Sequence, residues 1–161
     1  MAWTLAEGIV KEVIDHLDAD LAAKLNTLDT EYNDGITLTD PIDIVYTDPE
    51  LPTGGAMLAP RIHVIASQTR MQEWRQTTVR GEHDVVIWVT AQDPDLENLR
   101  KRIYRYGRAI FEVMVAGHFD SSITWNMIGL PIVDFGAILT RNSMAAADCT
   151  LQTTLIKLET A

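Results

Sequence analysis

The sequence predicts one α+β domain over residues 1–161, in which a mixed, mainly antiparallel sheet packs against two main helices and extends into a long hairpin arm. Two long stretches repeat apolar residues at every third or fourth position, as amphipathic helices do. Several shorter stretches alternate apolar and polar residues between turn-forming residues, as strands do. Strands therefore outnumber helices, which favours a sheet with both helices packed on it. A chain of 161 residues is typical of a single domain.

The first predicted helix runs from Thr4 to about Tyr32. Thr4 opens a segment with the spacing of a capping box, and Gly35 supplies the left-handed backbone that commonly ends a helix. A second helix capped by Asp18 or Asp20 is the alternative if the first one breaks there. The apolar residues that fall on one face are Leu5, Ile9, Val13, Leu17, Leu21, Leu25 and Leu28.

Three strands are predicted between the two helices. The first covers Ile42–Tyr46, and an exposed loop rich in proline and glycine follows at 48–55. The next two strands cover Arg61–Ser67 and Glu82–Thr90. The last of them carries apolar residues on both faces, which is typical of a central strand covered on both sides.

The polar segment Gln68–Arg80 joins these two strands and is predicted to form the hairpin arm. Two interpretations are open. The arm is a mobile loop whose arginines are incidental, or it reaches a neighbouring chain with a tryptophan as its apolar anchor. Trp and Arg are among the residue types found most often at interface hot spots. The second interpretation assigns four residues to an interface: Arg70, Trp74, Arg75 and Arg80.

The second helix is predicted to begin with Asp93 as its N-cap and Pro94 at its first position. Acidic residues in its first turn suit the positive end of the helix dipole, and Gly117 ends it. Two strands then close the chain, Val133–Thr140 and Ala146–Glu159.

The second helix also carries a dense basic face. One interpretation is a solvated face with the ion pairs Glu97–Lys101 and Arg108–Glu112. The other is a contact surface, because a basic patch on one subunit can meet an acidic patch on the next and close a ring. The basic residues are Lys101, Arg102, Arg105 and Arg108, and the candidate acidic partners on the first helical segment are Asp15, Asp18, Asp20, Asp29, Glu31 and Asp34.

The sequence contains no catalytic or nucleotide-binding motif. We therefore expect a protein that is not an enzyme and holds no cofactor and no metal. His63 and His83 could meet across neighbouring strands, either as hydrogen-bonded sheet histidines or as a metal site. Cys149 stands on a strand without a histidine nearby in sequence, which favours a buried structural thiol over a nucleophile.

The formal net charge of −10 argues against nucleic-acid binding through the bulk of the surface, because phosphate contacts need clustered Lys and Arg. The charge either serves solubility or forms an acidic surface that DNA passes without sticking. No apolar run is long enough to span a bilayer, and no signal peptide is recognisable. The single cysteine favours a reducing compartment, so we expect a cytoplasmic product without membrane contact.

The order of these elements resembles that of the tail terminator, or tail completion, proteins of long-tailed bacteriophages. The resemblance spans nearly the whole chain and concerns layout, because the family has no catalytic signature to match. It rests on the opening helix Leu5–Leu28, the strand Ile42–Tyr46 before a Pro/Gly loop, the strand pair Arg61–Ser67 and Glu82–Thr90, the helix start Asp93-Pro94-Asp95, and the closing pair Val133–Thr140 and Ala146–Glu159.

The resemblance implies a hexameric ring that caps the finished tail tube and joins it to the neck of the head. The partners would be the tail tube protein and the head–neck stopper protein, and DNA would pass through the lumen without specific binding. The location would be the virion, assembled in the host cytoplasm. Two other classes are kept open: a small acidic homo-oligomeric adaptor unrelated to phage, and an unidentified enzyme.

Overall fold

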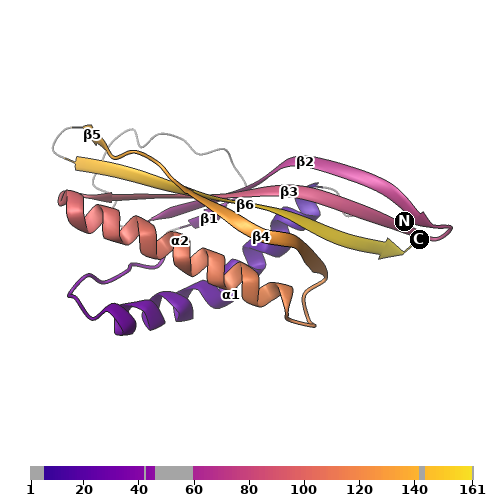
Figure 1. The fold of residues 1–161 in the computed structure, drawn as a ribbon, viewed down its shortest axis with the longest axis horizontal. Coiled ribbons are helices and arrows are strands. Elements are labelled where there is room, and N and C mark those ends of the chain that lie inside the picture. Colours follow the sequence, from indigo (N-terminus) through magenta and orange to yellow (C-terminus); the bar gives the residue numbers. More distant parts are fainter. Residues whose placement is uncertain (1–5, 42, 46–59, 142–143, 161) are drawn as a thin grey trace.

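The computed structural model describes residues 6–41, 43–45, 60–141 and 144–160. Within these ranges, two helices and six strands form two layers, with both helices on the same face of one sheet (Figure 1). The predicted α+β class is confirmed. The elements are α1 (Ala6–Tyr32), β1 (Asp43–Val45), β2 (Arg61–Arg75), β3 (Thr78–Asp93), α2 (Leu96–His118), β4 (Trp125–Phe135), β5 (Leu139–Arg141) and β6 (Met144–Thr160).

The sheet has the strand order β1-β2-β3-β6-β4, and β5 also pairs with β6. Among the described strands, β1 runs parallel to β2 and the other pairings are antiparallel. β3 is therefore central, as predicted. Val85 and Ile87 on its helix-facing side are buried, whereas Val86 and Trp88 on the other side are half-buried. The face of β3 that carries Val86 and Trp88 is less buried than the sequence predicts, because both helices pack on the opposite face of the sheet.

α1 is one continuous helix of 27 residues, so the break considered in its middle does not occur. Leu21 and Leu25 keep the helix on the core through this region. Asn33 ends the helix by donating its N–H to the carbonyl of Asp29 at 3.0 Å, and its φ is 43°. The predicted capping box at Thr4 lies partly outside the described residues.

α2 begins two residues later than predicted. Its N-cap is Asp95, whose side chain accepts the Asn98 N–H at 2.8 Å. Asp93 instead accepts the N–H of Asp95 at 2.8 Å and forms an ion pair with Arg102. The prediction of an Asp93 cap was wrong because Arg102, nine residues further along the chain, binds that carboxylate, which leaves Asp95 to cap the helix.

The predicted arm consists of regular strands. β2 extends to Arg75 and β3 begins at Thr78, so the segment 68–80 is the end of an antiparallel hairpin. β6 continues alongside β3 as far as the pair Thr78–Thr160, which makes the arm three-stranded. The arm projects past the layer of helices (Figure 1). The interpretation of this segment as a mobile loop is therefore wrong.

β4 differs most from the prediction. The sequence predicts a strand at Val133–Thr140, whereas β4 already begins at Trp125. Gly129, with a φ of 69°, and Pro131 interrupt the alternating pattern, and the register with β6 shifts at this point. Such a shift is a β-bulge. It breaks the alternation of apolar and polar residues, so the first half of the strand was not predicted from the sequence. The closing strand predicted at Ala146–Glu159 is confirmed by β6.

The core lies between the sheet and the two helices, with Trp125 and Tyr106 as its largest fully buried side chains. Cys149 of β6 is buried in this core, as predicted. Burial, helped by the charge of Asp148, raises the pKa of the Cys149 thiol to about 12, so the thiolate is scarce at neutral pH. Neither described helix has the length and apolar character needed to cross a membrane.

Replacing Asp95 with Ala is expected to lower the free energy of unfolding by about 1 kcal/mol, because the Asn98 N–H loses its acceptor. For a domain of this size, the melting temperature should fall by roughly 2–4 °C, which circular dichroism measures. Asp95→Asn keeps an acceptor oxygen and is the matched control, which should remain close to the parent. Equal losses in the two variants would contradict the capping role.

Candidate assembly surfaces

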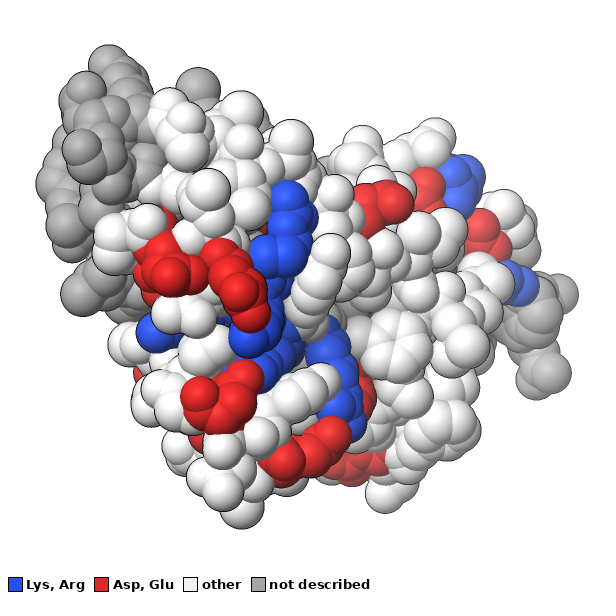
Figure 2. Space-filling view, turned by 60° about the vertical axis from the view of Figure 1, so that its left-hand side comes forward, with Lys and Arg blue, Asp and Glu red and all other residues white. Residues whose placement is uncertain are grey.

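The basic face of α2 is neutralised within its own chain. In the space-filling view, acidic side chains lie directly beside the basic ones (Figure 2). Each of the four predicted contact residues forms an ion pair inside the chain: Lys101, Arg102, Arg105 and Arg108. The prediction of an exposed basic surface does not hold for Arg105, whose side chain is only 5% exposed.

Arg105 is the most enclosed of these residues. Its Nη1 and Nη2 donate to the two carboxylate oxygens of Asp34 at 3.0 and 2.5 Å. Its guanidinium also lies over the ring of Tyr32, with 4.1 Å between Cζ and the ring centroid. The hydrogen bond from Arg105 lowers the pKa of Asp34 to about 2. Asp34, considered as a partner on a neighbouring subunit, thus fixes the turn after α1 against α2 of the same chain.

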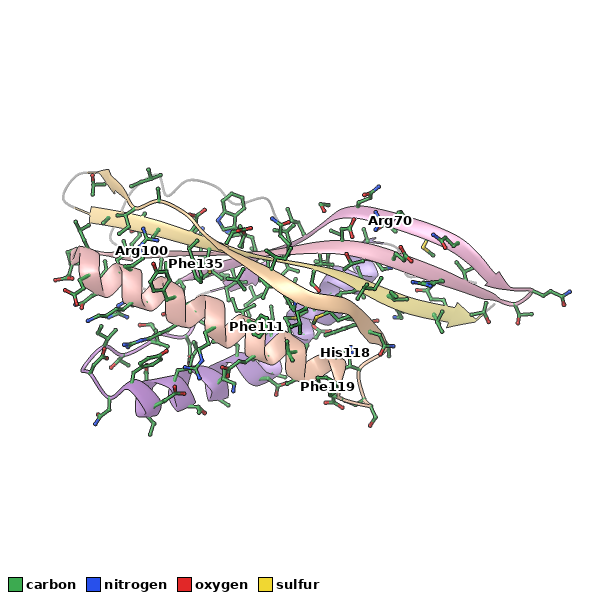
Figure 3. All side chains as sticks on the ribbon, in the orientation of Figure 1. Arg70, Arg100, Phe111, His118, Phe119 and Phe135 are labelled. Carbon is green, nitrogen blue, oxygen red and sulfur yellow. The ribbon has the colours of Figure 1, made fainter. Side chains whose placement is uncertain are left out.

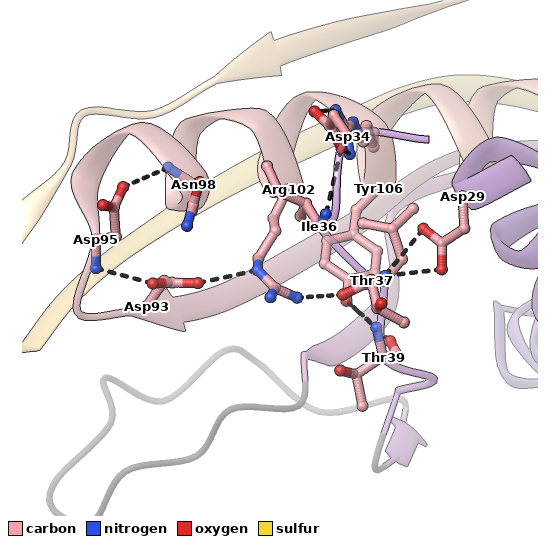
Figure 4. A network of polar contacts seen from close by, with 12 residues as sticks. Asp29, Asp34, Ile36, Thr37, Thr39, Asp93, Asp95, Asn98, Arg102 and Tyr106 are labelled. Atoms are coloured by element: carbon pink, nitrogen blue, oxygen red, sulfur yellow. Dashed lines mark hydrogen bonds and ion pairs between the residues drawn. The ribbon is translucent and has the colours of Figure 1, made fainter. Parts of the chain in front are cut away.

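Arg102 and Tyr106 hold the irregular segment that follows α1 (Figure 4). Arg102 donates to the Asp93 carboxylate at 2.9 Å and to the Thr37 carbonyl at 2.5 Å. The Tyr106 hydroxyl donates to the Thr39 carbonyl at 2.9 Å and accepts the Thr39 N–H at 3.0 Å. Burial raises the pKa of Tyr106 to about 12, so the hydroxyl stays protonated and keeps its donor. Two α2 side chains therefore position the segment that leads towards β1.

Arg108 and Lys101 form ion pairs nearer the surface. Arg108 donates to Glu112, one turn later on α2, at 2.7 Å, and to Glu31 of α1 at 2.8 Å. Lys101 pairs with Glu97 at 2.7 Å. The two pairs expected of a solvated face are confirmed. Glu31, which the sequence also offered as a partner on a neighbouring subunit, is engaged inside its own chain.

A ladder of polar side chains crosses β2, β3 and β6 at the base of the arm. Arg70 of β2 donates to both carboxylate oxygens of Asp84 on β3, at 3.0 and 3.2 Å. Oδ1 of Asp84 also accepts the hydroxyl of Thr154 on β6 at 2.7 Å. Cross-strand pairs of opposite charge stabilise a sheet, so the ladder connects β2, β3 and β6 on the sheet face that points away from the helices. Arg70 keeps 40% of its side chain exposed.

The tip of the arm holds the other three predicted interface residues. Arg80 pairs with Glu82 on the same strand at 2.8 Å. Trp74 and Arg75 stand at the end of β2 beside a register shift in the hairpin, and their side chains lie outside the described residues. The interface role of the arm residues stays a prediction.

His63 and His83 do not meet across the sheet, because their cross-strand partners are Trp88 and Thr69. His83 is buried, and its Nδ1 lies 3.1 Å from the hydroxyl of Thr69. Burial lowers the pKa of His83. The hydrogen-bonded sheet histidine is therefore the interpretation that the structure supports. No group of three or more His, Cys, Asp and Glu in the described part of the chain could hold a metal ion.

The structure contains an apolar surface that the sequence analysis missed. β4 is an edge strand, since among the described strands it pairs only with β6. At its bulge, the side chains of Ile128, Leu130 and Ile132 are 45%, 73% and 62% exposed; we call these three residues the β4 surface. The sequence signal was the uncharged run 121–133 in a chain with 22% charged residues.

The end of β4 is fastened to α2 by aromatic and polar contacts (Figure 3). The rings of Phe135 and Tyr104 meet edge to face, with their centroids 4.8 Å apart. Arg100 donates to the Gly136 carbonyl at 2.9 Å. Gly107 of α2 leaves room for this contact, because a Cβ there would lie 2.9 Å from the Phe135 ring. The β4 surface is thus anchored to the body of the domain next to its exposed residues.

No family model matches the chain, and no curated protein matches it. Among solved structures, the chain is similar to one described as "Virion of native gene transfer agent (GTA) particle", with 14% sequence identity and a TM-score of 0.38. The match covers 96% of this chain and 99% of that chain. Similarity at this level does not define a function.

Replacing Arg105 with Met is expected to lower the free energy of unfolding by about 1–3 kcal/mol, because the enclosed guanidinium and its bidentate contact are lost. The midpoint of urea unfolding measures the change. Lys101→Met is the matched control, since the ion pair of Lys101 is with the exposed Glu97 one turn away, and its midpoint should hardly move. A parent-like midpoint for Arg105→Met would show that the ion pair does not hold α1 against α2.

The Asp34 ion pair also predicts a pH dependence. The pKa of Asp34 in the folded chain, about 2, is lower than its ordinary value of 3.8. The stabilisation is therefore present above about pH 4 and is lost as the pH falls towards 2. We expect Asp34→Asn to be less stable than the parent at pH 7 and the difference to shrink between pH 4 and 2. Urea midpoints measured over this range test it, and a constant difference would contradict it.

Proposed function

We propose that this chain is a virion structural protein: a ring-forming tail terminator or neck subunit that caps the tail tube and joins it to the head while DNA passes through. The observation that carries the proposal is the β4 surface. Three large apolar side chains lie exposed on an edge strand, a feature that monomeric proteins avoid and that commonly marks a site of association.

The layout of the fold supports the same proposal. The resemblance to tail terminator proteins implies an opening helix, a mixed sheet against two helices and closing strands at the C-terminus. The observed order of elements, with β4, β5 and β6 after α2, agrees with this layout. The agreement concerns the arrangement of elements alone, and the assembly role is our inference from the exposed edge.

The distribution of charge supports a path for DNA. The chain carries a net charge of −10, and the densest basic cluster, on α2, is already paired with carboxylates of the same chain. Such a surface repels phosphate and does not retain it. In the proposed ring, DNA therefore moves through the lumen without specific contacts.

The proposed partners are further copies of this chain in a hexameric ring, the tail tube protein on one side and the head–neck stopper protein on the other. The ring would be assembled in the host cytoplasm and retained in the virion. The arm residues Arg70, Trp74, Arg75 and Arg80 belong to the proposed interface. The four basic residues of α2 form ion pairs within the subunit. An interface contact at this helix would be made by the parts of these ion pairs that stay exposed.

The purified protein is expected to form a particle with a mass near six times the 18.0 kDa of one chain. Size-exclusion chromatography with light scattering measures the mass, and negative-stain electron microscopy shows whether the particle is a ring with a lumen. The ring should not shift duplex DNA in a gel at 0.15 M salt. A chain that remains monomeric at high concentration, or a particle that binds DNA tightly, contradicts the proposal.

A further inference from the structure

We propose that the hairpin arm (residues 68–80) of one copy covers the β4 surface of the next copy, and that side chains make this contact without strand addition. The inference rests on the proposed function, because it names the contact by which neighbouring copies of the ring adjoin. It follows from the chemistry of β4, from the local geometry of its bulge and from the positions of the two surfaces on the sheet.

The chemistry of the β4 surface fits a second copy of the same chain. Two copies that each carry −10 repel one another, so they associate most readily where neither surface adds negative charge. The uncharged run 121–133 is such a place. Its exposed members Ile128, Leu130 and Ile132 supply apolar area that a partner can remove from water.

The bulge excludes a regular strand partner. Gly129 has a φ of 69°, Pro131 has no N–H to donate, and the pairing with β6 shifts register across residues 129–131. Bulges and prolines are the devices by which edge strands avoid backbone pairing. The same bulge leaves Leu130 as the most exposed large apolar residue of the strand. A partner therefore contacts this edge through the exposed side chains of β4 and not through backbone hydrogen bonds.

The position of the arm fits a head-to-tail contact. A ring of identical subunits needs two different surfaces that meet each other, and the strand order places β2 and β4 towards opposite edges of the sheet. Within the described residues, β1 pairs with β2 at Arg61–His63. Beyond that point no other described strand lies on the outer side of β2, so the arm has an edge available to a neighbour.

The charges of the two surfaces are complementary. The arm contains three arginines and one glutamate and so carries +2, whereas the rest of the chain carries −12. Arg70 and Arg80 are paired with Asp84 and Glu82 of their own chain, so a neighbour meets only the exposed side of these ion pairs. On the receiving side, the uncharged run ends in two exposed acids, Asp120 and Asp134. Arg70, with 40% of its side chain exposed, remains accessible to a carboxylate of the neighbour. Charge orients the arm, and the apolar side chains supply most of the buried area.

Cross-linking between two variants that each gain one exposed cysteine tests the contact directly. Gln72→Cys places a thiol on the exposed arm, and Leu130→Cys places one on the β4 surface. The native thiol of Cys149 is buried, which keeps background reaction with a short bismaleimide low. We expect a mixture of the two variants to give a covalent dimer that contains one chain of each kind. Both positions are exposed in the single chain, so neither substitution disturbs the core of the subunit.

The controls separate the possible outcomes. Ala23→Cys lies exposed on α1 and should not cross-link to Gln72→Cys. Dimers formed by Leu130→Cys alone would show a two-fold contact between β4 strands and overturn the inference. A parent that forms rings while the mixture stays uncross-linked would overturn the arm contact and leave the proposed function standing. A parent that forms no ring would instead remove the proposed function itself.

Discussion

The ion pairs between α2 and the end of α1 are the interaction on which the rest of the fold depends. Both helices lie on one face of the sheet, and Arg105 and Arg108 connect α2 to Asp34 and Glu31. The same helix face positions residues 37–39 on the path to β1. Removing one partner of such an enclosed pair leaves the other charge uncompensated, and the bidentate geometry makes the contact strongly directional. Their main effect is to fix where the chain leaves the first helix.

Periodicity in the sequence was enough to predict both helices, the central strand and the long closing strand, because each buries one regular stripe or face. It could not predict the burial of Arg105, since its partner Asp34 lies 71 residues away. The sequence predicted the wrong N-cap for α2, because Asp93 and Asp95 offer the same local chemistry. A tertiary contact, the ion pair of Asp93 with Arg102, decides between them. The β4 surface escaped notice because a bulge breaks the alternation on which strand prediction relies.

These failures have a common physical origin. The sequence showed that α2 is basic and that α1 is acidic, and the remaining question was whether those charges meet within one chain or between two. Coulomb attraction is the same in both cases, but a contact within one chain costs no loss of translational freedom. The acids at the end of α1 therefore pair within the chain where the turn after α1 brings them close, and α2 has no unpaired basic face left for association. This distinction moves the proposed interface from the basic helix to the bulged edge strand and the arm.

A bulged apolar edge suits an assembly that must stop growing. A regular edge strand accepts any extended segment, so it permits open-ended aggregation. A contact made by side chains such as Leu130 requires a matching partner surface at a defined angle. β3 and β6 run without interruption from the core pair Asp93–Ala145 to the arm pair Thr78–Thr160, so the twist of the core sheet sets the direction in which the arm projects. In the proposed ring, the angle between the arm and the β4 surface of one subunit sets the number of copies, and the continuous pair β3 and β6 holds the arm at its angle.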